Sequence, residues 1–263
     1  MSGPAAGGAR PEPLTARTTV SVVVPVLDDA DHLRACLALL ARQTRRPDEV
    51  VVVDNGSTDD SAAVARAAGA RVIHEPVRGI PSAAAAGYDA ARGDLILRCD
   101  ADSRVPEDWV ERIVARFAAQ PEMLGLTGPG VFYDQPGLLS RVRSDAYTAA
   151  YRWVGGAAVA GTPLWGSNCA LRAEAWRDVR DRVHRHRADV HDDFDLSFQL
   201  LLHAPGCTRF DAGLRVGAAG RLFSSLDARV RQGRMAVTTI RLNWAELSPG
   251  LRWVRRAQAA ARP

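Results

Sequence analysis

Short continuous apolar runs, each followed by a turn and then by a helix-forming segment, dominate the first half of the chain. Runs of this kind, without polar alternation, predict strands that are covered on both faces. Strands are therefore expected at residues 19–27, 49–53, 71–74 and 94–99. Helices are expected between them, at residues 31–42, 60–68, 81–92 and 106–120, the last beginning at Pro106. This alternation predicts an α/β fold with a mostly parallel sheet flanked by helices.

The rhythm changes after residue 122. Short strands are expected at residues 123–127 and 131–133, helices at 138–154 and 192–203, and a strand or loop at 164–172. Residues 153–171 carry no formal charge and are about as long as a membrane-spanning helix. Their glycines, proline, serine and asparagine would break a helix and leave polar groups in lipid. We therefore reject a membrane span there.

Composition adds little to this picture. A length of 263 residues allows one large domain or two small ones. The net charge is +4, and every basic residue is Arg, which looks like coding bias beside the many alanines. We give the charge little weight and expect no nucleic-acid partner. The four scattered cysteines lie in or beside apolar segments, which predicts reduced core thiols in a cytoplasmic protein.

Acidic residues follow three of the predicted strands. Asp28 follows the first strand, Asp54 the second, and Asp100 and Asp102 the fourth. Side chains at i and i+2 of an extended segment point the same way, so Asp100 and Asp102 can face one site. Two carboxylates suit Mg²⁺ or Mn²⁺, especially beside substrate phosphates. Taken alone, the pair is more typical of a solvated turn.

A dinucleotide-binding fold offers a different interpretation of the first strand–helix unit, with Asp54 as the acid that holds a ribose. Such a fold needs a G-x-G-x-x-G turn after the first strand, whereas this chain has Pro25-Val-Leu-Asp-Asp29. Without glycines the backbone does not approach a pyrophosphate closely. The sequence therefore argues against hydride transfer.

Several motifs together resemble the family 2 glycosyltransferases with a GT-A fold. The motifs, in the family's order and rough spacing over residues 19–220, are VSVVVPVLDD, VVVDNGSTDDS, the Arg78-Gly79 loop with its Ala-rich helix, LRCDADSRVPEDWV, WGSNCALR and DDFDLSFQL. The resemblance implies a GT-A-like domain at residues 19–225, with a nucleotide-sugar-binding half at 19–120 and an acceptor and catalytic-base half at 121–225. A disordered leader at residues 1–18, which has no apolar core like that of a signal peptide, and a helical extension at 226–263 would flank it.

The resemblance also implies roles for single residues. Asp193 would be the catalytic base and Asp102 the ligand of Mg²⁺ or Mn²⁺. The implied nucleotide contacts are Pro25, Val26, Asp28, Asp54, Arg78, Asp100 and Ala101. The implied donor and acceptor pocket comprises Trp165, Gly166, Ser167, Asn168 and Asp192. Helix capping would also explain Asp192 and Asp193, and Trp165 is either a stacking platform or a core residue.

The chain departs from the family pattern at two turns. Leu27-Asp28-Asp29 replaces Tyr-Asn-Glu, and Asn55 replaces the second acid of Asp-Asp-Gly-Ser, which leaves the donor open as a UDP- or GDP-sugar. The Gln-x-x-Arg-Trp signature of processive synthases is absent, which favours single transfers. Arg98 pairs either with phosphates or with a neighbouring acid.

The chemistry implied is transfer of a sugar from a nucleoside-diphosphate donor to an acceptor hydroxyl, which could be lipid-linked. A metal would stabilise the departing diphosphate, and a single base would imply direct displacement with inversion. We expect a role in cell-envelope glycan, glycolipid or secondary-metabolite synthesis. The alternatives are a non-catalytic nucleotide-sugar-binding partner subunit and a nucleotidyltransferase on a similar fold.

Tryptophan and arginine alternate with apolar residues over residues 226–256. This mixture suits a membrane interface, and it equally suits a helix packed on the domain. The expected location is therefore the cytoplasm, with peripheral contact to the inner face of the membrane as one possibility.

Overall fold

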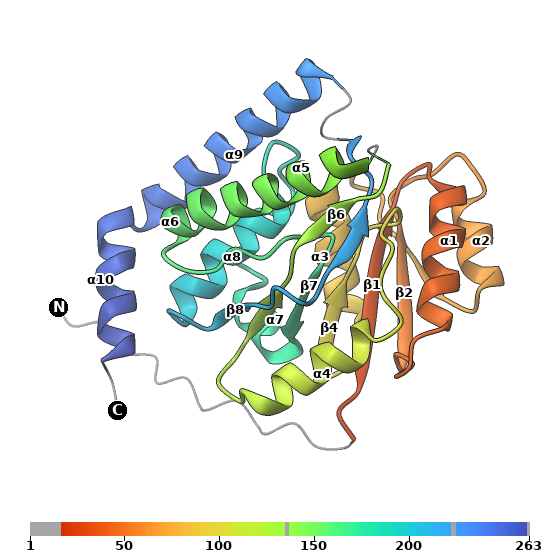
Figure 1. Ribbon diagram of the computed structural model, residues 1–263, viewed down its shortest axis with the longest axis horizontal. Coiled ribbons are helices and arrows are strands. Elements are labelled where there is room, and N and C mark those ends of the chain that lie inside the picture. The colour runs from red at the N-terminus through yellow and green to blue at the C-terminus, as the bar shows by residue number, and fades with distance from the viewer. Residues whose placement is uncertain (1–16, 135–136, 222–224, 262–263) are drawn as a thin grey trace.

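A seven-stranded sheet forms the centre of the computed structural model, which describes residues 17–134, 137–221 and 225–261 (Figure 1). Its order is β3-β2-β1-β4-β7-β5-β8. The strands are β1 (Val20–Val26), β2 (Glu49–Asp54), β3 (Arg71–His74), β4 (Leu95–Arg98), β5 (Gly125–Thr127), β7 (Cys169–Arg172) and β8 (Thr208–Phe210). Only β7 runs antiparallel to its neighbours, so the predicted mostly parallel sheet is confirmed. A second, two-stranded sheet pairs β6 (Gly130–Phe132) with β9 (Val216–Ala218).

Helices cover both faces of the sheet because its valines point alternately to either side. Val20, Val22 and Val24 pack in one cluster with α1 (Ala30–Ala41), α2 (Ser61–Ala67) and α4 (Trp109–Ala119). Val23 packs in the opposite cluster with α3 (Ile80–Ala90), α7 (Ala173–Val179) and α8 (Asp192–His203). Burial of both faces accounts for the continuous apolar runs in the sequence.

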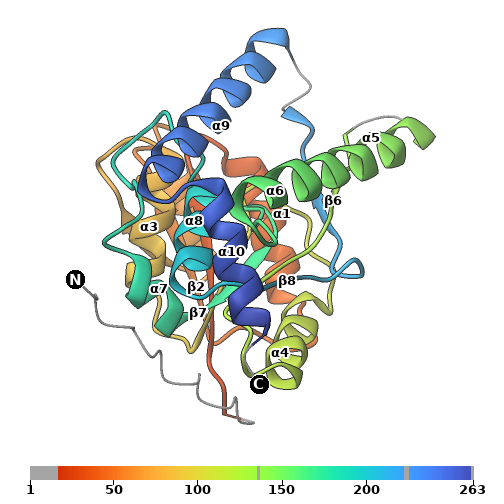
Figure 2. The ribbon, with the colours of Figure 1, turned by 90° about the vertical axis from the view of Figure 1, so that its left-hand side faces the viewer.

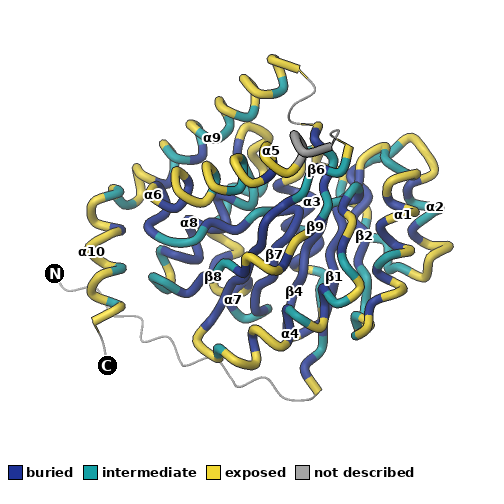
Figure 3. Tube along the Cα trace, in the orientation of Figure 1, coloured by how far each residue is buried: buried dark blue, intermediate teal, exposed yellow. Residues whose placement is uncertain are grey.

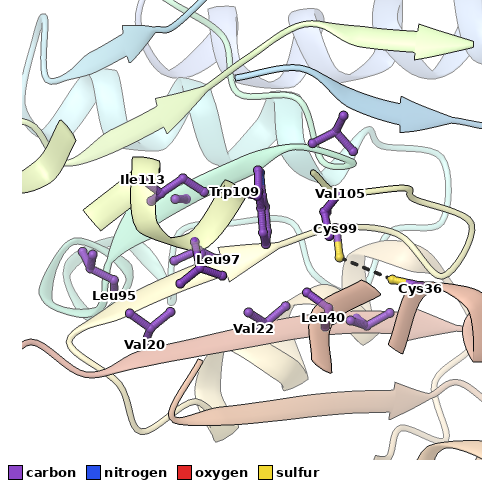
Figure 4. Packing of buried hydrophobic residues seen from close by; sticks show 14 of the residues in the cluster. Val20, Val22, Cys36, Leu40, Leu95, Leu97, Cys99, Val105, Trp109 and Ile113 are labelled. Carbon is purple, nitrogen blue, oxygen red and sulfur yellow. Dashed lines mark hydrogen bonds between the residues drawn. The ribbon is translucent and has the colours of Figure 1, made fainter. Parts of the chain in front are cut away.

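The cysteines confirm the expected core thiols. All four are free and buried. Figure 4 shows Cys36, a residue of α1, pointing toward Cys99 among the apolar side chains of one cluster. The two sulfur atoms lie 3.8 Å apart.

The carboxyl ends of β1, β2 and β4 meet at one edge of the sheet. β1 lies between β2 and β4, and the register pairs Val26 at the end of β1 with Asp54 at the end of β2. Strand order reverses at β1, and ligands of open α/β sheets bind at such an edge. The fold therefore gathers the acids that the sequence placed after separate strands.

Two helices differ from the prediction by more than two residues. Helix α4 begins at Trp109 and not at Pro106, because the Pro106 carbonyl closes a turn with the Trp109 N–H (3.1 Å) and accepts the Gln43 side chain (2.7 Å). The helix expected at residues 138–154 is α5 (Gly137–Ala150) followed by a π-helical turn, η1 (Tyr151–Gly155), and α6 (Gly156–Val159).

The C-terminal segment forms two helices, α9 (Leu226–Glu246) and α10 (Pro249–Ala260). Arg252 of α10 is buried and donates to the Phe198, Asn243 and Leu247 carbonyls, which ties α10 to α8 and α9. The N-terminal part of α9 extends beyond the sheet in both views (Figures 1 and 2). Much of α5, α9 and α10 is exposed (Figure 3).

None of the helices in the described ranges combines the length and the apolar character that crossing a membrane requires. The leader expected at residues 1–18 falls, for residues 1–16, outside the described part of the chain.

Candidate functional site

A cavity of about 630 Å³ opens where the carboxyl end of β4 faces α5, α8 and α9. We call it the central cavity. Its charged lining consists of Arg98, Asp100, Asp102, Asp192, Asp193 and Arg221. Asp102 and Asp193, which lie far apart in the sequence, thus line the same space.

Arg98 is the buried cation of this cavity. Its guanidinium forms ion pairs with Asp192 and, at 3.2 Å, with Asp100, and its side chain is only 3% exposed. The sequence alternative in which Arg98 pairs with neighbouring acids is therefore the observed one. Burial raises the pKa of Asp192 to about 6, although Arg98 opposes this shift. Two acids on one buried arginine leave neither of its partners free to act as a nucleophile.

Gly166 lies directly against the Arg98 guanidinium. A Cβ at this position would stand 2.8 Å from the guanidinium carbon and from both of its terminal nitrogens. Only glycine therefore lets the loop before β7 pass over the buried cation. The same loop supplies Ser167, whose hydroxyl donates to Asp100 Oδ2 at 2.5 Å.

Asp102 faces Arg221, which follows β9. Arg221 Nε lies 3.2 Å from Asp102 Oδ2, and Arg221 also forms an ion pair with Asp29. Burial, and next the charge of Asp100, raise the pKa of Asp102 to about 6, while Arg221 acts in the opposite direction. Sequence reasoning missed Arg221, because nothing in the local pattern separates it from the other arginines of the chain.

Asp193 stands in the first turn of α8 and is half-buried. Its Oδ2 accepts the Gly166 N–H at 2.7 Å, and its Oδ1 accepts the Phe194 N–H at 2.7 Å. The capping explanation therefore does not hold: the N-cap of α8 is His191, without a side-chain capping bond, and the Gly166 bond of Asp193 reaches across to another element. The two N–H donors fix the orientation of a carboxylate that lines the central cavity.

Trp165 and Asn168 differ in their surroundings. Trp165 lines the central cavity, and its ring lies against Gly130 and edge-on to Tyr147. Asn168 is fully buried; its amide accepts Trp109 Nε1 at 2.9 Å and donates to the Leu214 carbonyl at 2.6 Å. Asn168 is therefore not part of the cavity lining expected for it and instead anchors the loop that presents Ser167.

The remaining predicted nucleotide contacts lie at the ends of β1, β2 and β4, beside the cavity. Pro25, Val26 and Ala101 are buried, so ligands reach them mainly through their backbone. Asp28 has a left-handed backbone (φ 50°), and its carboxylate accepts the Thr58 N–H at 2.6 Å, which lowers its pKa. Arg78 lies 3.8 Å from Asp28.

The second turn is built on Asp54 and Asn55. Asp54 is nearly buried and accepts the Ser57 N–H at 3.0 Å. The Asn55 amide donates to the Glu75 and Val77 carbonyls at 2.9 and 2.8 Å and accepts the Gly79 N–H at 2.7 Å. An aspartate has no amide donors, so the departure from the family pattern at residue 55 is what pins the 75–79 loop.

Two exposed apolar side chains at this edge escaped sequence reasoning. Leu27 and Val77 are 42% and 44% exposed, and they adjoin Asp28 and Arg78 in sequence. Leu27 ends a run that the pattern assigns to a buried strand, and Val77 lies in a predicted loop. Hydrophobicity alone therefore did not mark either residue as part of a site. They offer flat apolar surface beside the charged pair.

Asp195 is a third acid in the first turn of α8. It is buried and accepts the His184 N–H at 2.7 Å, and it contacts His184 Nδ1 at 2.8 Å and Asn243 Nδ2 at 2.7 Å. His191 contacts the Gln232 carbonyl through Nε2 at 3.0 Å.

The acids fit a divalent cation that shares its coordination with a ligand. Within the described ranges, no three His, Cys, Asp or Glu side chains converge closely enough to hold a metal by themselves. Asp102 and Asp100 nevertheless place hard oxygen donors together in a partly buried site. Mg²⁺ and similar ions are commonly held by one or two carboxylates, with substrate phosphates and water completing the shell.

An open, mostly parallel sheet with acids at the carboxyl ends of its central strands is typical of α/β proteins that bind a nucleotide at the switch point of the sheet. The sequence profile described as "Glycosyl transferase family 2" matches residues 21–153, and that of "Glycosyl transferase family group 2" matches residues 95–219. The chain belongs to glycosyl transferase family 2.

Curated relatives match only part of the chain. An undecaprenyl-phosphate 4-deoxy-4-formamido-L-arabinose transferase of Pseudomonas fluorescens is 33% identical over 116 residues, which is 40% of this chain and 34% of the relative. An uncharacterized glycosyltransferase of Mycobacterium tuberculosis is 40% identical over 96 residues, 36% of this chain and 42% of the relative. The matches therefore span well under half of these relatives.

Solved structures resemble the whole fold. The mannosyltransferase PcManGT from Pyrobaculum calidifontis, in complex with GDP-Man and Mn²⁺, has a TM-score of 0.66 at 20% identity over 96% of this chain and 78% of that chain. Glucosyl-3-phosphoglycerate synthase from Mycobacterium tuberculosis, with Mn²⁺, UDP and glucosyl-3-phosphoglycerate, has a TM-score of 0.60 at 20% identity over 87% and 80%. These neighbours establish the GT-A fold predicted from the sequence.

Proposed function

We propose that this protein is a metal-dependent, inverting glycosyltransferase that moves one sugar from a UDP- or GDP-sugar to an acceptor hydroxyl. The observation that carries this proposal is that Asp102 and Asp193 line one cavity at the switch edge of the sheet. One acid then lies on the diphosphate side and the other is available to the acceptor. The GDP-Man and UDP bound by the structural neighbours support a nucleotide-sugar donor.

In this mechanism Asp193 accepts the proton of the acceptor hydroxyl as general base. Its carboxylate is oriented by the Gly166 and Phe194 N–H groups, so little reorganisation is needed before proton transfer. Asp192 is engaged by Arg98 and supplies no second nucleophile. A single free carboxylate favours direct displacement and hence inversion at the anomeric carbon.

Asp102 would hold Mg²⁺ or Mn²⁺, with Asp100 as a nucleotide contact beside it, and the ion, when bound, would stabilise negative charge on the departing diphosphate. The Mn²⁺ in the neighbouring structures supports this assignment. Arg221 adds a side-chain cation at the same carboxylate.

The base and ribose would lie at the ends of β1 and β2. Asp28, Asp54 and Arg78 offer polar contacts there, and Leu27 and Val77 offer apolar surface to the base. Pro25, Val26 and Ala101 would shape the floor of this part of the site through their backbone.

Assays of sugar transfer and of donor hydrolysis with Mn²⁺ test the proposal. Asp193→Asn should lose at least about a hundredfold in transfer, the lower end of a general base's contribution, and should keep metal-stimulated UDP binding. Asp102→Ala should lose that stimulation. Asp189→Asn, at an acid paired with Arg187 outside the central cavity, is the matched control. Equally slow release of nucleotide by wild type and Asp193→Asn with every donor tried would refute the enzyme assignment.

We also propose peripheral contact with the inner face of a membrane through the Arg- and Trp-rich C-terminal helices. Trp244 and Trp253 are partly exposed, and Arg241 and Arg255 are exposed on the same two helices. Aromatic rings and cations together favour an anionic lipid surface. Co-sedimentation with anionic vesicles should exceed that with neutral vesicles; equal or no binding would oppose the proposal.

A further inference from the structure

The central cavity is charged at one end and apolar along most of its length. Beyond the carboxylates, its walls are built by Ala150, Tyr151 and Val154 of α5 and η1 on one side and by Ala236 and Ile240 of α9 on the other. A nucleotide and a sugar bind mainly through polar contacts. Their binding therefore does not explain the apolar part of the cavity.

Two polar groups at these walls are already bonded within the protein. Tyr151 donates its hydroxyl to the Leu164 carbonyl at 2.6 Å, so its ring and not its hydroxyl is left for a ligand. His191 is engaged through Nε2 by the Gln232 carbonyl at 3.0 Å. The walls therefore offer hydrocarbon surface and few free donors to an occupant.

The local backbone widens the helix at this wall. Residues Tyr151–Gly155 form a π-helical turn, and Tyr151, Val154 and Gly155 from this one turn all line the cavity. Turns of this kind are rare and are found frequently at functional sites.

The apolar wall continues to the outside of the molecule. Val154 lines the cavity and is 70% exposed, and Trp153 beside it is exposed to the same degree. The indole N–H groups of Trp244 and Trp253 donate to the carbonyls of Ala158 and Ala157 at 3.1 Å each, which places both partly exposed rings around α6, next to η1. An apolar path therefore leads from the cavity to an apolar surface.

We infer that the acceptor is an amphiphile, with its hydroxylated head near Asp193 and its apolar chain held between η1 and α9. This inference rests on the proposed function and specifies its acceptor class. A cavity of about 630 Å³ has the size of an ordinary ligand pocket and accommodates a head group together with the first part of a chain. A fully polar acceptor would leave Val154, Ala236 and Ile240 in contact with water.

Binding of monomeric alkyl glucosides to the full chain tests the inference. Calorimetry below the critical micelle concentration should show affinity rising about fifteenfold from hexyl to octyl glucoside, since each buried methylene contributes about fourfold. Glucose alone should bind much more weakly. Affinity that does not depend on chain length would overturn the inference.

Two matched pairs of variants locate the chain. Val154→Asp should abolish the dependence on chain length, while Val142→Asp, at an exposed valine of α5 outside the cavity lining, should keep it. Ala236→Asp should act like Val154→Asp, and Val237→Asp, its neighbour outside the lining, should not. If each control variant lost as much affinity as its partner, the chain would bind elsewhere and the inference would fail.

UDP binding with Mn²⁺, measured on the same samples, separates this inference from the proposed function. Wild type that binds UDP without any chain-length dependence refutes the amphiphilic acceptor and leaves the transferase standing. Wild type that shows the chain-length dependence and binds no nucleotide refutes the transferase and leaves an amphiphile site.

Phosphatidylcholine vesicles that contain dodecyl glucoside form a second arm. Binding above that to bare vesicles, lost in Val154→Asp, supports uptake of the chain from a bilayer. Binding in the monomeric arm alone supports uptake from solution.

Discussion

Arg221 Nε lies 3.2 Å from Oδ2 of Asp102, the acid assigned to the metal. The same guanidinium pairs with Asp29, so one cation from the segment after β9 links two acids from the ends of β1 and β4. The Arg221 guanidinium therefore lies beside the carboxylate that would bind a divalent cation, and the two positive charges compete for Asp102.

Replacing Arg221 with Gln should tighten Mn²⁺ binding in the absence of nucleotide. The expected change is about threefold to tenfold, because a half-exposed ion pair contributes on the order of 1 kcal/mol. Calorimetric titration with Mn²⁺ measures it. Arg215→Gln, at an exposed pair with Asp145, is the control and should leave the affinity unchanged. Weaker Mn²⁺ binding by Arg221→Gln would show that the arginine supports the ion instead of competing with it.

Asn55→Asp should loosen the loop that carries Arg78. The substitution turns two amide donors into a carboxylate oxygen that faces the Glu75 and Val77 carbonyls. We expect a loss of about 2 kcal/mol in the free energy of unfolding, because two hydrogen bonds of a buried side chain are lost. Hydrogen exchange at the Gly79 amide should also accelerate. Unchanged exchange and stability would mean that the loop is held by other contacts.

Gly166→Ala should disturb the buried ion pair beneath it. The added methyl would stand 2.8 Å from the Arg98 guanidinium, which has no room to retreat from Asp192 and Asp100. We expect a destabilisation of about 2–4 kcal/mol in urea unfolding, in the range of overpacking and of a broken buried pair. Gly233→Ala in α9, where a Cβ meets nothing within 4 Å, should instead stabilise by up to about 1 kcal/mol. Similar effects of the two changes would contradict the close approach at Gly166.

Stability should fall at mildly alkaline pH through His184. The hydrogen bond to Asp195 raises the pKa of His184 above its ordinary value, so the folded protein favours the protonated ring. This stabilisation is fully present below the pKa of the unfolded chain, about 6.5, and is lost as pH rises through the higher folded-state pKa. The free energy of unfolding of wild type minus that of His184→Gln should therefore be larger at pH 6 than at pH 8.5. His186→Gln, at an exposed histidine of the same segment, should show no such difference. A gap between wild type and His184→Gln that is constant with pH would contradict the assignment.

Local pattern was sufficient to predict the sheet and the acids at its edge. Burial on both faces requires continuous apolar strands, and the period of two places Asp100 and Asp102 on one side of an extended segment. The parallel arrangement then brings Asp54 beside the end of β1, as the register of Val26 with Asp54 confirms. The order of the motifs predicted the family, and the sequence profile confirms it over residues 21–153.

Contacts between distant segments were decided only by the tertiary structure. The Arg98 guanidinium leaves no room for a side chain at residue 166, and the Gly166 N–H orients the Asp193 carboxylate. The local sequence does not indicate either contact. The resemblance placed Asn168 in the ligand pocket, because the sequence alone does not show whether an asparagine amide is buried and hydrogen-bonded or exposed to a ligand. The sequence thus determined which chemical groups emerge from which strand ends, through periodicity and burial. The fold decided that Arg221 meets Asp102 and that η1 and α9 enclose an apolar cavity, because such contacts depend on how separate elements pack in space.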